Sequence, residues 1–122
     1  MTSLAAELRP DEALEFLEGL RPHHGYPVID DEEMLVGMVM RHEIEEWVGE
    51  GNTRTLGDLV EKQTVISVTS ESPIREAARL MVRHDYQQLP VLSTKQKDRV
   101  LGILTLNDIA RQQNAFDRQI DQ

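Results

Sequence analysis

Short apolar clusters alternate with polar stretches along the chain, and they follow two different spacings. In residues 10–20 and 73–84 apolar side chains recur every three or four positions, which predicts two amphipathic helices, each opened by a proline. Residues 26–29 and 89–92 are short continuous apolar runs, which predicts two strands. A proline near the start of each run suits an edge or entry position in a sheet.

Two longer apolar runs follow the short ones. Residues 34–40 and 99–105 contain few polar side chains, as expected for strands that are covered on both faces. Gly37 and Gly102 interrupt these runs at matching places, which predicts a β-bulge or a close approach to the backbone.

The whole set of elements occurs twice. Pro27 and Pro90 are 63 residues apart, and the two prolines that open the helices have the same separation. Gly37 and Gly102 are 65 residues apart, so the second copy is two residues longer in the intervening turn, where an insertion costs little. The chain therefore contains two copies of a helix–strand–strand–helix unit, and its fold class is α+β.

The stretch between the copies predicts a loop, a helical turn in residues 55–60 and a strand in residues 64–68 that leads into the second copy. The first copy shows no such leader, because Met1 already aligns with the start of that strand. We therefore expect residues 1–50 to form the first unit with a truncated entry segment. Residues 51–122 form the second unit with its leader turn, and the sequence reads as part of a longer chain.

Composition narrows the class of protein. The chain has 122 residues, 39% of them hydrophobic and 29% charged, which is typical of a soluble globular domain. Its net charge of −9 argues against nucleic acid or an anionic membrane surface as the main partner. It has no cysteine, no apolar run long enough to cross a bilayer and no secretory signal at its start.

The two copies resemble CBS domains, named after cystathionine β-synthase. The resemblance covers essentially the whole chain and rests on "YPVI…LVGMVMRHEI" in the first copy and "QLPVL…VLGILTLNDI" in the second. It implies an α+β fold of two pseudo-symmetric βαββα halves packed through their small sheets. It also implies a regulatory module and homodimer that is not an enzyme and that binds ATP, ADP or AMP between its copies.

The first copy is similar to the first CBS unit in the cytoplasmic tails of CLC-type chloride channels and exchangers. The similarity lies in "HGYPV" and in "LVGMVMR", which ends at Arg41 just after the strand. It implies an attached transmembrane transporter domain and a position on the cytoplasmic side, as the soluble tail of an inner or plasma membrane protein. Two alternatives stay open, namely a ligand-free dimerisation module and a regulatory module of a soluble enzyme.

Thr105 and Asp108 are the first candidate site residues. Thr-x-x-Asp before an apolar helix is a capping box, but a carboxylate also binds the hydroxyls of a ribose, and a helix start favours phosphate. The second copy alone has this pair, since Met40 and Glu43 stand at the equivalent positions of the first, which favours binding. We expect the cleft around Met40 and Glu43 not to take nucleotide, and to be empty, filled by side chains or used in packing.

His23 and His24 are adjacent histidines, which raises the question of a metal site. They have no third ligand at a familiar spacing, so no metal site is predicted, and histidines in a loop before a strand are the simpler interpretation. The resemblance offers a third interpretation, in which His23, His24, Gly25 and Tyr26 line the pocket of the adenine base. Tyr26 or a histidine would then stack on the base, and Thr2 could contribute from the preceding segment.

Overall fold

The structure is a computed structural model, and it describes residues 2–20 and 25–111. Its labelled elements follow one another in the order β1 (Leu4–Ala5), α1 (Pro10–Leu17), β2 (Gly25–Ile29), β3 (Leu35–Met40), α2 (Arg41–Gly49), α3 (Leu56–Leu59), β4 (Val68–Thr69), α4 (Ile74–His84), β5 (Gln88–Leu92) and β6 (Val100–Thr105). A further helix begins at Leu106, directly after β6. None of the helices in these ranges is long and apolar enough to span a bilayer.

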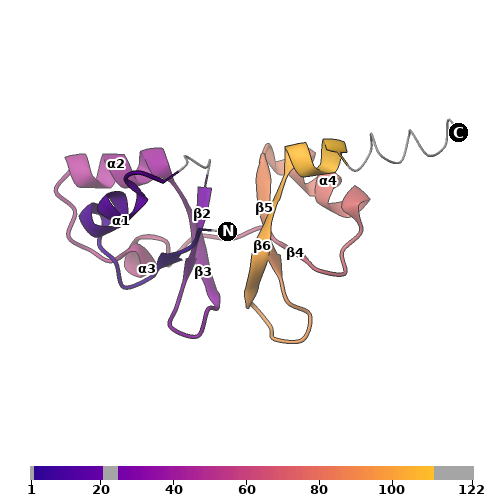
Figure 1. Cartoon of the computed structure of the whole chain (residues 1–122), viewed down its shortest axis with the longest axis horizontal. Helices are drawn as coiled ribbons and strands as arrows, with labels where there is room; N and C mark the ends of the chain where they lie inside the picture. The colour runs from indigo at the N-terminus through magenta and orange to yellow at the C-terminus, as the bar shows by residue number, and fades with distance from the viewer. Residues whose placement is uncertain (1, 21–24, 112–122) are drawn as a thin grey trace, which may run out of the picture.

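Two small sheets lie at the middle of the molecule and the helices lie on its outer sides (Figure 1). The strand order is β1-β2-β3 in the first sheet and β4-β5-β6 in the second. In each sheet the first pair of strands is parallel and the second pair is antiparallel. This arrangement confirms the predicted α+β fold of two similar halves.

The first half has an entry strand, contrary to the expectation from the sequence. Leu4 in β1 pairs with Val28, just as Val68 in β4 pairs with Val91. The predicted strand at residues 64–68 begins only at Val68, and the residues before it connect the two halves. The equivalent of β4 is therefore the strand β1, and both strands have only two residues.

The short helix α3 packs on the first half, although it follows that half in sequence. Leu56 and Val60 are buried in the same core cluster as the side chains of β1 and β2. Two backbone hydrogen bonds fix the helix there, from Leu56 N to Leu8 O at 2.7 Å and from Gly57 N to Ala6 O at 2.9 Å. The predicted domain division at residue 50 stays a prediction, but the core of the first half includes residues beyond it.

The hairpin tips of the two sheets are joined across the middle of the molecule. Leu35 N donates to Asp98 O at 2.7 Å, and Val100 N donates to Glu33 O at 3.3 Å. An ion pair of 2.6 Å links the Arg99 guanidinium to the Glu33 carboxylate. These contacts hold one end of the two sheets together.

Both sheets contain the irregularity that the glycines predicted. The ladder register shifts so that Val36 in β3 and Leu101 in β6 have no direct partner, each one residue before the glycine. A Cβ atom on Gly37 would lie 2.6 Å from Val60 Cγ2, whereas nothing lies within 4 Å of the same position on Gly102. Leu101 is 52% exposed, so β6 is not covered on both faces as its apolar run predicted.

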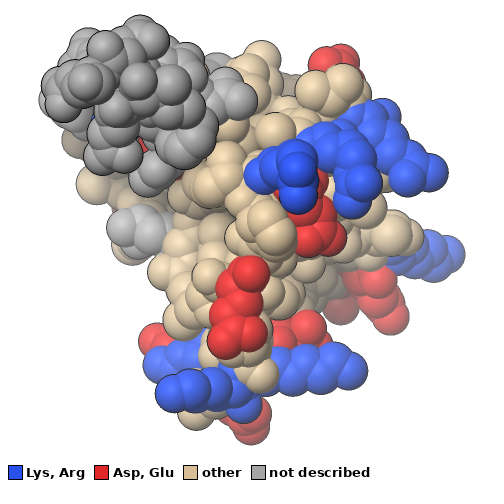
Figure 2. All heavy atoms as spheres, turned by 90° about the vertical axis from the view of Figure 1, so that its right-hand side faces the viewer, with Lys and Arg blue, Asp and Glu red and all other residues tan. Residues whose placement is uncertain are grey.

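Charged side chains are unevenly distributed over the surface. Figure 2 looks onto the end of the molecule formed by the second half, and Lys and Arg side chains gather in groups on it although the whole chain carries −9. The ion pairs between described residues join exposed side chains, so each contributes about 1 kcal/mol or less to stability.

Candidate functional site

Thr105 and Asp108 form a reciprocal capping box at the end of β6. Thr105 N donates to Asp108 Oδ2 at 2.9 Å, and Asp108 N donates to Thr105 Oγ1 at 3.1 Å. These bonds satisfy backbone amides that the first turn of a helix leaves without partners. The structural role of the pair is therefore visible, and its role in ligand binding stays a prediction.

Asp108 is held in its charged form. The hydrogen bond from the Thr105 amide, followed by the Thr105 hydroxyl, lowers the pKa of Asp108, and the Arg111 guanidinium adds to this effect. Partial desolvation opposes it by raising the pKa. The carboxylate is thus ionised at neutral pH, and an ionised carboxylate is a stronger hydrogen-bond acceptor than a neutral one.

The equivalent position in the first half is capped by a carboxylate alone. Glu43 Oε1 accepts from Met40 N at 2.9 Å, so the longer acid replaces Asp108 in the bond to the backbone. Met40 has no hydroxyl to complete the box. One carboxylate is therefore enough to start this helix, and the threonine of the second copy is the distinctive group.

The other predicted site residues are divided between the core and the part of the chain that the structure does not describe. His23 and His24 lie outside the described residues. Gly25 is buried at the start of β2 and pairs with Met40. Tyr26 is 1% exposed and belongs to the core of the first half, so its ring presents no open face for stacking.

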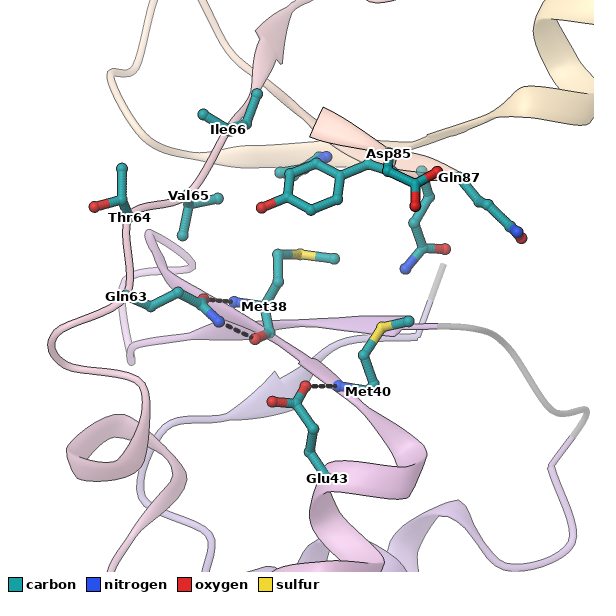
Figure 3. Close-up of a pocket in the computed structure, with 12 residues that line it drawn as sticks. Met38, Met40, Glu43, Gln63, Thr64, Val65, Ile66, Asp85 and Gln87 are labelled. Atoms are coloured by element: carbon teal, nitrogen blue, oxygen red, sulfur yellow. Dashed lines mark hydrogen bonds between the residues drawn. The ribbon is translucent and has the colours of Figure 1, made fainter. Parts of the chain in front are cut away.

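A cavity of about 410 Å³ lies between the two halves, on the side of Met40 and Glu43 (Figure 3). This volume falls in the range of about 300–1,000 Å³ that is typical of small-molecule sites. Its walls come from β3, the start of α2, the connecting segment, the turn after α4 and β5. The lining residues are Met38, Met40, Glu43, Gln63, Thr64, Val65, Ile66, Asp85, Tyr86, Gln87, Gln88 and Pro90.

The sequence left open whether the cleft around Met40 and Glu43 is empty, filled by side chains or used in packing, and the structure has an open cavity there. Side chains do not fill it, and the side chains of Met38 and Met40 reach into it from β3 (Figure 3). The repeat in the sequence could have located this cavity. Residues 85–88 follow residues 22–25 at the 63-residue separation of the two copies. If residues before β2 line one adenine pocket, the residues before β5 are expected to line the equivalent pocket on the other side.

The polar side chains that line the cavity differ in their hydrogen bonding. The Gln63 carboxamide bonds to the backbone of Met38, and Glu43 bonds to the backbone of Met40. The buried Gln88 Nε2 has no hydrogen-bond partner within the described part of the chain. A buried donor without a partner costs about 1–3 kcal/mol, so a ligand with an acceptor at this point would relieve that penalty.

The charges of the lining are all negative. Glu43 and Asp85 contribute carboxylates, and no Lys or Arg is among the residues that line the cavity. Apolar side chains, chiefly of Met, Val and Ile, form much of the remaining wall. The cavity thus suits a largely apolar ligand with some hydrogen-bonding groups, and it disfavours a cluster of phosphates inside it.

The fold and the repeat agree with a comparison against known families. A family model described as the CBS domain matches residues 2–50 and 56–114. The chain belongs to the CBS domain family. Its two matched segments correspond to the two halves of the structure, except that the second segment includes α3, which packs on the first half. The predicted tandem CBS pair is confirmed.

Curated relatives of this CBS pair include enzymes. Inosine-5'-monophosphate dehydrogenase of Helicobacter pylori is 28% identical over 88 residues, which are 71% of this chain and 17% of that protein. The corresponding protein of Methanocaldococcus jannaschii is 30% identical over 87 residues, which are 71% of this chain and 16% of that protein. The chain therefore spans less than a fifth of the length of these relatives.

Solved structures share the fold over most of the chain. CBSX2 in complex with AMP is 26% identical, with a TM-score of 0.75 over 96% of this chain and 90% of that chain. Hypoxic Response Protein I with two coordinated zinc ions is also 26% identical, with a TM-score of 0.76 over 92% and 90%. In this chain, residues 2–20 and 25–111 contain no cluster of three or more His, Asp or Glu that could hold a metal ion.

A transporter domain has the same fold at lower identity. The CBS pair of the putative Mg²⁺ transporter SO5017 from Shewanella oneidensis has a TM-score of 0.76 over all of this chain and 67% of that chain, at 18% identity. These matches establish the CBS pair. They do not establish the narrower resemblance to chloride-channel tails.

Proposed function

We propose that this CBS pair is a regulatory module that binds an adenine nucleotide between its halves and alters the state of an attached membrane transporter. The cavity of about 410 Å³ at the junction of the halves carries this proposal. A ligand held there contacts both halves and the segment that connects them.

The repeat defines two pseudo-symmetric positions for the ligand, and the cavity described above lies at one of them. The proposed nucleotide site on the side of the capping box includes Thr105, Asp108, Gly25, His23 and His24, with the threonine and aspartate on the ribose. The cavity on the side of Glu43 is its pseudo-symmetric counterpart. The bound AMP of the similar protein CBSX2 supports an adenine ligand, and AMP, ADP and ATP are the candidates.

The regulatory mechanism follows from the position of the ligand. A ligand that binds more tightly to one arrangement of the halves shifts the population toward it. The shift reaches an attached domain to the extent that this domain also prefers one arrangement, and the coupling is reciprocal. Gln63 and the residues that follow it form one wall of the cavity, so ligand binding would act directly on the connection between the halves.

For the attached domain we propose a chloride channel or exchanger, on the strength of "GYPV" and "LVGMVMR" in the first copy. The dehydrogenases among the relatives favour a second candidate, in which the pair regulates a soluble enzyme. The reading frame around this segment in its gene distinguishes the two. Membrane spans beside the pair support the first, and a catalytic domain supports the second.

Isothermal titration with AMP, ADP and ATP tests ligand binding. We expect saturable binding by the native chain, and loss of binding in one cleft for Asp108→Ala and in the other for Glu43→Ala. Asp31→Ala is the control, since Asp31 lies exposed in the turn after β2, away from the cavity. Absence of heat and of thermal stabilisation with all three nucleotides would favour the alternative of a ligand-free dimerisation module.

A further inference from the structure

The short helix α3 is held on the first half by hydrogen bonds at both of its ends. At its N-terminal end, two backbone N–H groups donate to the carbonyl oxygens of Ala6 and Leu8. Beyond its C-terminal end, the Gln63 carboxamide bonds to the backbone N–H and C=O of Met38 in β3. Figure 1 shows α3 beside the first sheet, and no labelled helix of the described chain lies at the equivalent place beside β4 and β6.

The second half has the same carbonyl groups without the helix. Ser70 is the equivalent of Ala6, because the amide of each donates to the last residue of the neighbouring strand. Ser72 is the equivalent of Leu8, because the amide of each donates to the carbonyl oxygen three residues before it. Within residues 2–20 and 25–111, the carbonyl oxygens of Ser70 and Ser72 accept no hydrogen bond. These two oxygens are complementary in charge to the N–H groups at the start of a helix.

The outer edge of β6 is open as well. Ile103 is the equivalent of Met38, because each lies opposite the proline of the neighbouring strand. Since β6 is an edge strand and Gln63 bonds to the outward N–H and C=O of Met38, the same groups of Ile103 also face outward. They bond to no other residue in the described part of the chain. The edge thus offers one donor and one acceptor to a partner.

A side chain of the α3 segment fills the space over one strand in the first half only. Val60 packs over Gly37 so closely that a Cβ atom on this glycine would lie 2.6 Å from Val60 Cγ2. Gly102 is the equivalent glycine, and nothing lies within 4 Å of the same position on it. The second sheet therefore has open space where Val60 packs on the first sheet.

The apolar side chains around this space are incompletely covered. In the first half, Val28 and Val39 are fully buried in the core that α3 completes. Their equivalents Val91 and Leu104 are only half-buried. Val91 lies opposite Gly102, and Leu104 is two residues further along β6, so both border the open space. We call this surface the β6 face, and it consists of Ser70, Ser72, Val91, Gly102, Ile103 and Leu104.

We propose that the β6 face is a docking site for a short helix of a partner polypeptide, which repeats the contacts of α3. The first N–H groups of the docked helix bond to the carbonyl oxygens of Ser70 and Ser72. One of its apolar side chains packs over Gly102. A carboxamide after the helix pairs with the backbone of Ile103. The unpaired backbone groups and the exposed apolar surface are then covered together.

The α3 segment gives the chemistry of this partner. It has Leu56 at the start of the helix, Val60 four residues later and Gln63 three residues after that. A second copy of the chain does not supply such a helix, because its own Leu56 is fully buried in its own first half. The docking site does not depend on the nucleotide proposed above, because it uses neither the Glu43 cavity nor Asp108.

A synthetic peptide with the sequence of residues 53–64 tests docking. The peptide, acetylated at its N-terminus and amidated at its C-terminus, is titrated into the isotope-labelled native chain, and amide chemical shifts are followed. We expect saturable changes at Ser70, Gly102 and Ile103 and not in the first half, where the chain's own α3 is bound. Absence of changes at the β6 face with about 1 mM peptide would overturn the proposal.

A second peptide tests the apolar contact. The peptide that carries Leu56→Ser and Val60→Ser keeps the backbone groups and the carboxamide, and it should bind at least about tenfold more weakly. Equal affinity of the two peptides would mean that the native sequence does not bind through its apolar side chains, and the proposed docking mode would be wrong.

A change on the protein side tests the position of the site. Gly102→Leu places a side chain in the open space over β6 and should raise the dissociation constant of the native peptide at least about tenfold. Gly49→Leu is the matched control, because Gly49 at the end of α2 also has nothing within 4 Å of an added Cβ atom. Circular dichroism establishes that both variants are folded, and equal affinity of the two contradicts the proposal.

Sedimentation velocity distinguishes the proposed partner from a second copy of the chain. The peptide should bind whether or not the native chain associates with itself, and Gly102→Leu should leave the association state unchanged. Self-association that Gly102→Leu weakens and Gly49→Leu does not would mean that a second copy covers the β6 face, and it would overturn the proposal.

Discussion

The Gln63 side chain pairs with both backbone groups of Met38. Gln63 Oε1 accepts from Met38 N at 2.6 Å, and Gln63 Nε2 donates to Met38 O at 2.9 Å. The carboxamide thus pairs with the outer edge of β3 through one donor and one acceptor, as the backbone of a neighbouring strand would. It ties the segment between the halves to the first sheet, beside the cavity.

Replacing Gln63 should loosen this connection. Gln63→Ala removes both hydrogen bonds, and we expect the free energy of unfolding to fall by about 1–2 kcal/mol in urea denaturation. Gln63→Glu keeps an acceptor for Met38 N but loses the donor to Met38 O, and it should lie between the native chain and Gln63→Ala. If Gln63→Ala has the same urea midpoint of unfolding as the native chain, the two hydrogen bonds contribute nothing to stability.

The two equivalent glycines should respond differently to alanine. A Cβ atom on Gly37 would lie 2.6 Å from Val60 Cγ2 and 2.9 Å from Gln63 Oε1, so Gly37→Ala should destabilise the chain by about 1–3 kcal/mol. Gly102→Ala is the matched control. Nothing lies within 4 Å of its added atom, so its effect should stay within about 0.5 kcal/mol. Equal urea midpoints for the two variants would contradict the close approach at Gly37.

The charge of Asp108 should give a stability contribution that depends on pH. The pKa of Asp108 is lower in the folded chain than in the unfolded one, so the stabilisation is complete above the unfolded value of about 3.9. It is lost as the pH falls below that value, through the folded pKa. Asp108→Asn keeps the shape and removes the charge, and should cost about 0.3–1 kcal/mol at pH 7.

Urea titrations of both chains at pH 7 and at a series of lower pH values measure this effect. The difference between the native chain and Asp108→Asn should shrink as the pH is lowered below the unfolded value of about 3.9 and through the folded pKa, because the native carboxylate then becomes protonated. A difference that grows at low pH would mean that the charge does not stabilise the helix start.

Ligand charge should decide affinity in the cavity beside Glu43. In an Asp108→Ala background, which isolates this cavity, adenosine and AMP should bind more tightly than ATP, because two carboxylates and no cation line the walls. Glu43→Gln with Asp85→Asn should narrow the difference between AMP and ATP by about tenfold or more. Titration calorimetry gives both constants, and a preference for ATP in the unmodified cavity would contradict the expectation.

The fold was largely predictable because it is a repeat. Hydrophobic spacing located the helices and the hairpin strands, and the matching glycines located the bulges. The two-residue strands β1 and β4 were missed or misplaced, because two residues carry too little pattern to separate a strand from a connection. The packing of α3 on the first half could not be predicted either, because nothing in the sequence around Leu56 shows which of the two cores its side chain joins.

The candidate site was predictable in part. The sequence identified Thr105 and Asp108 as a pair, and the structure brings them together in the capping box. It could not show that Tyr26 turns into the core, because a residue at the start of a strand faces either side with similar ease. It also could not show that the cleft beside Met40 is open, since cavity volume depends on how the two halves pack.

The place of α3 also has a consequence for how this protein is made. While the chain is synthesised from its N-terminus, the first half lacks Leu56 and Val60 until translation passes residue 60, so its hydrophobic interior is incomplete up to that point. A fragment that stops at residue 50 would expose this interior to water. The first half becomes a finished folding unit only once the beginning of the second CBS match has been translated.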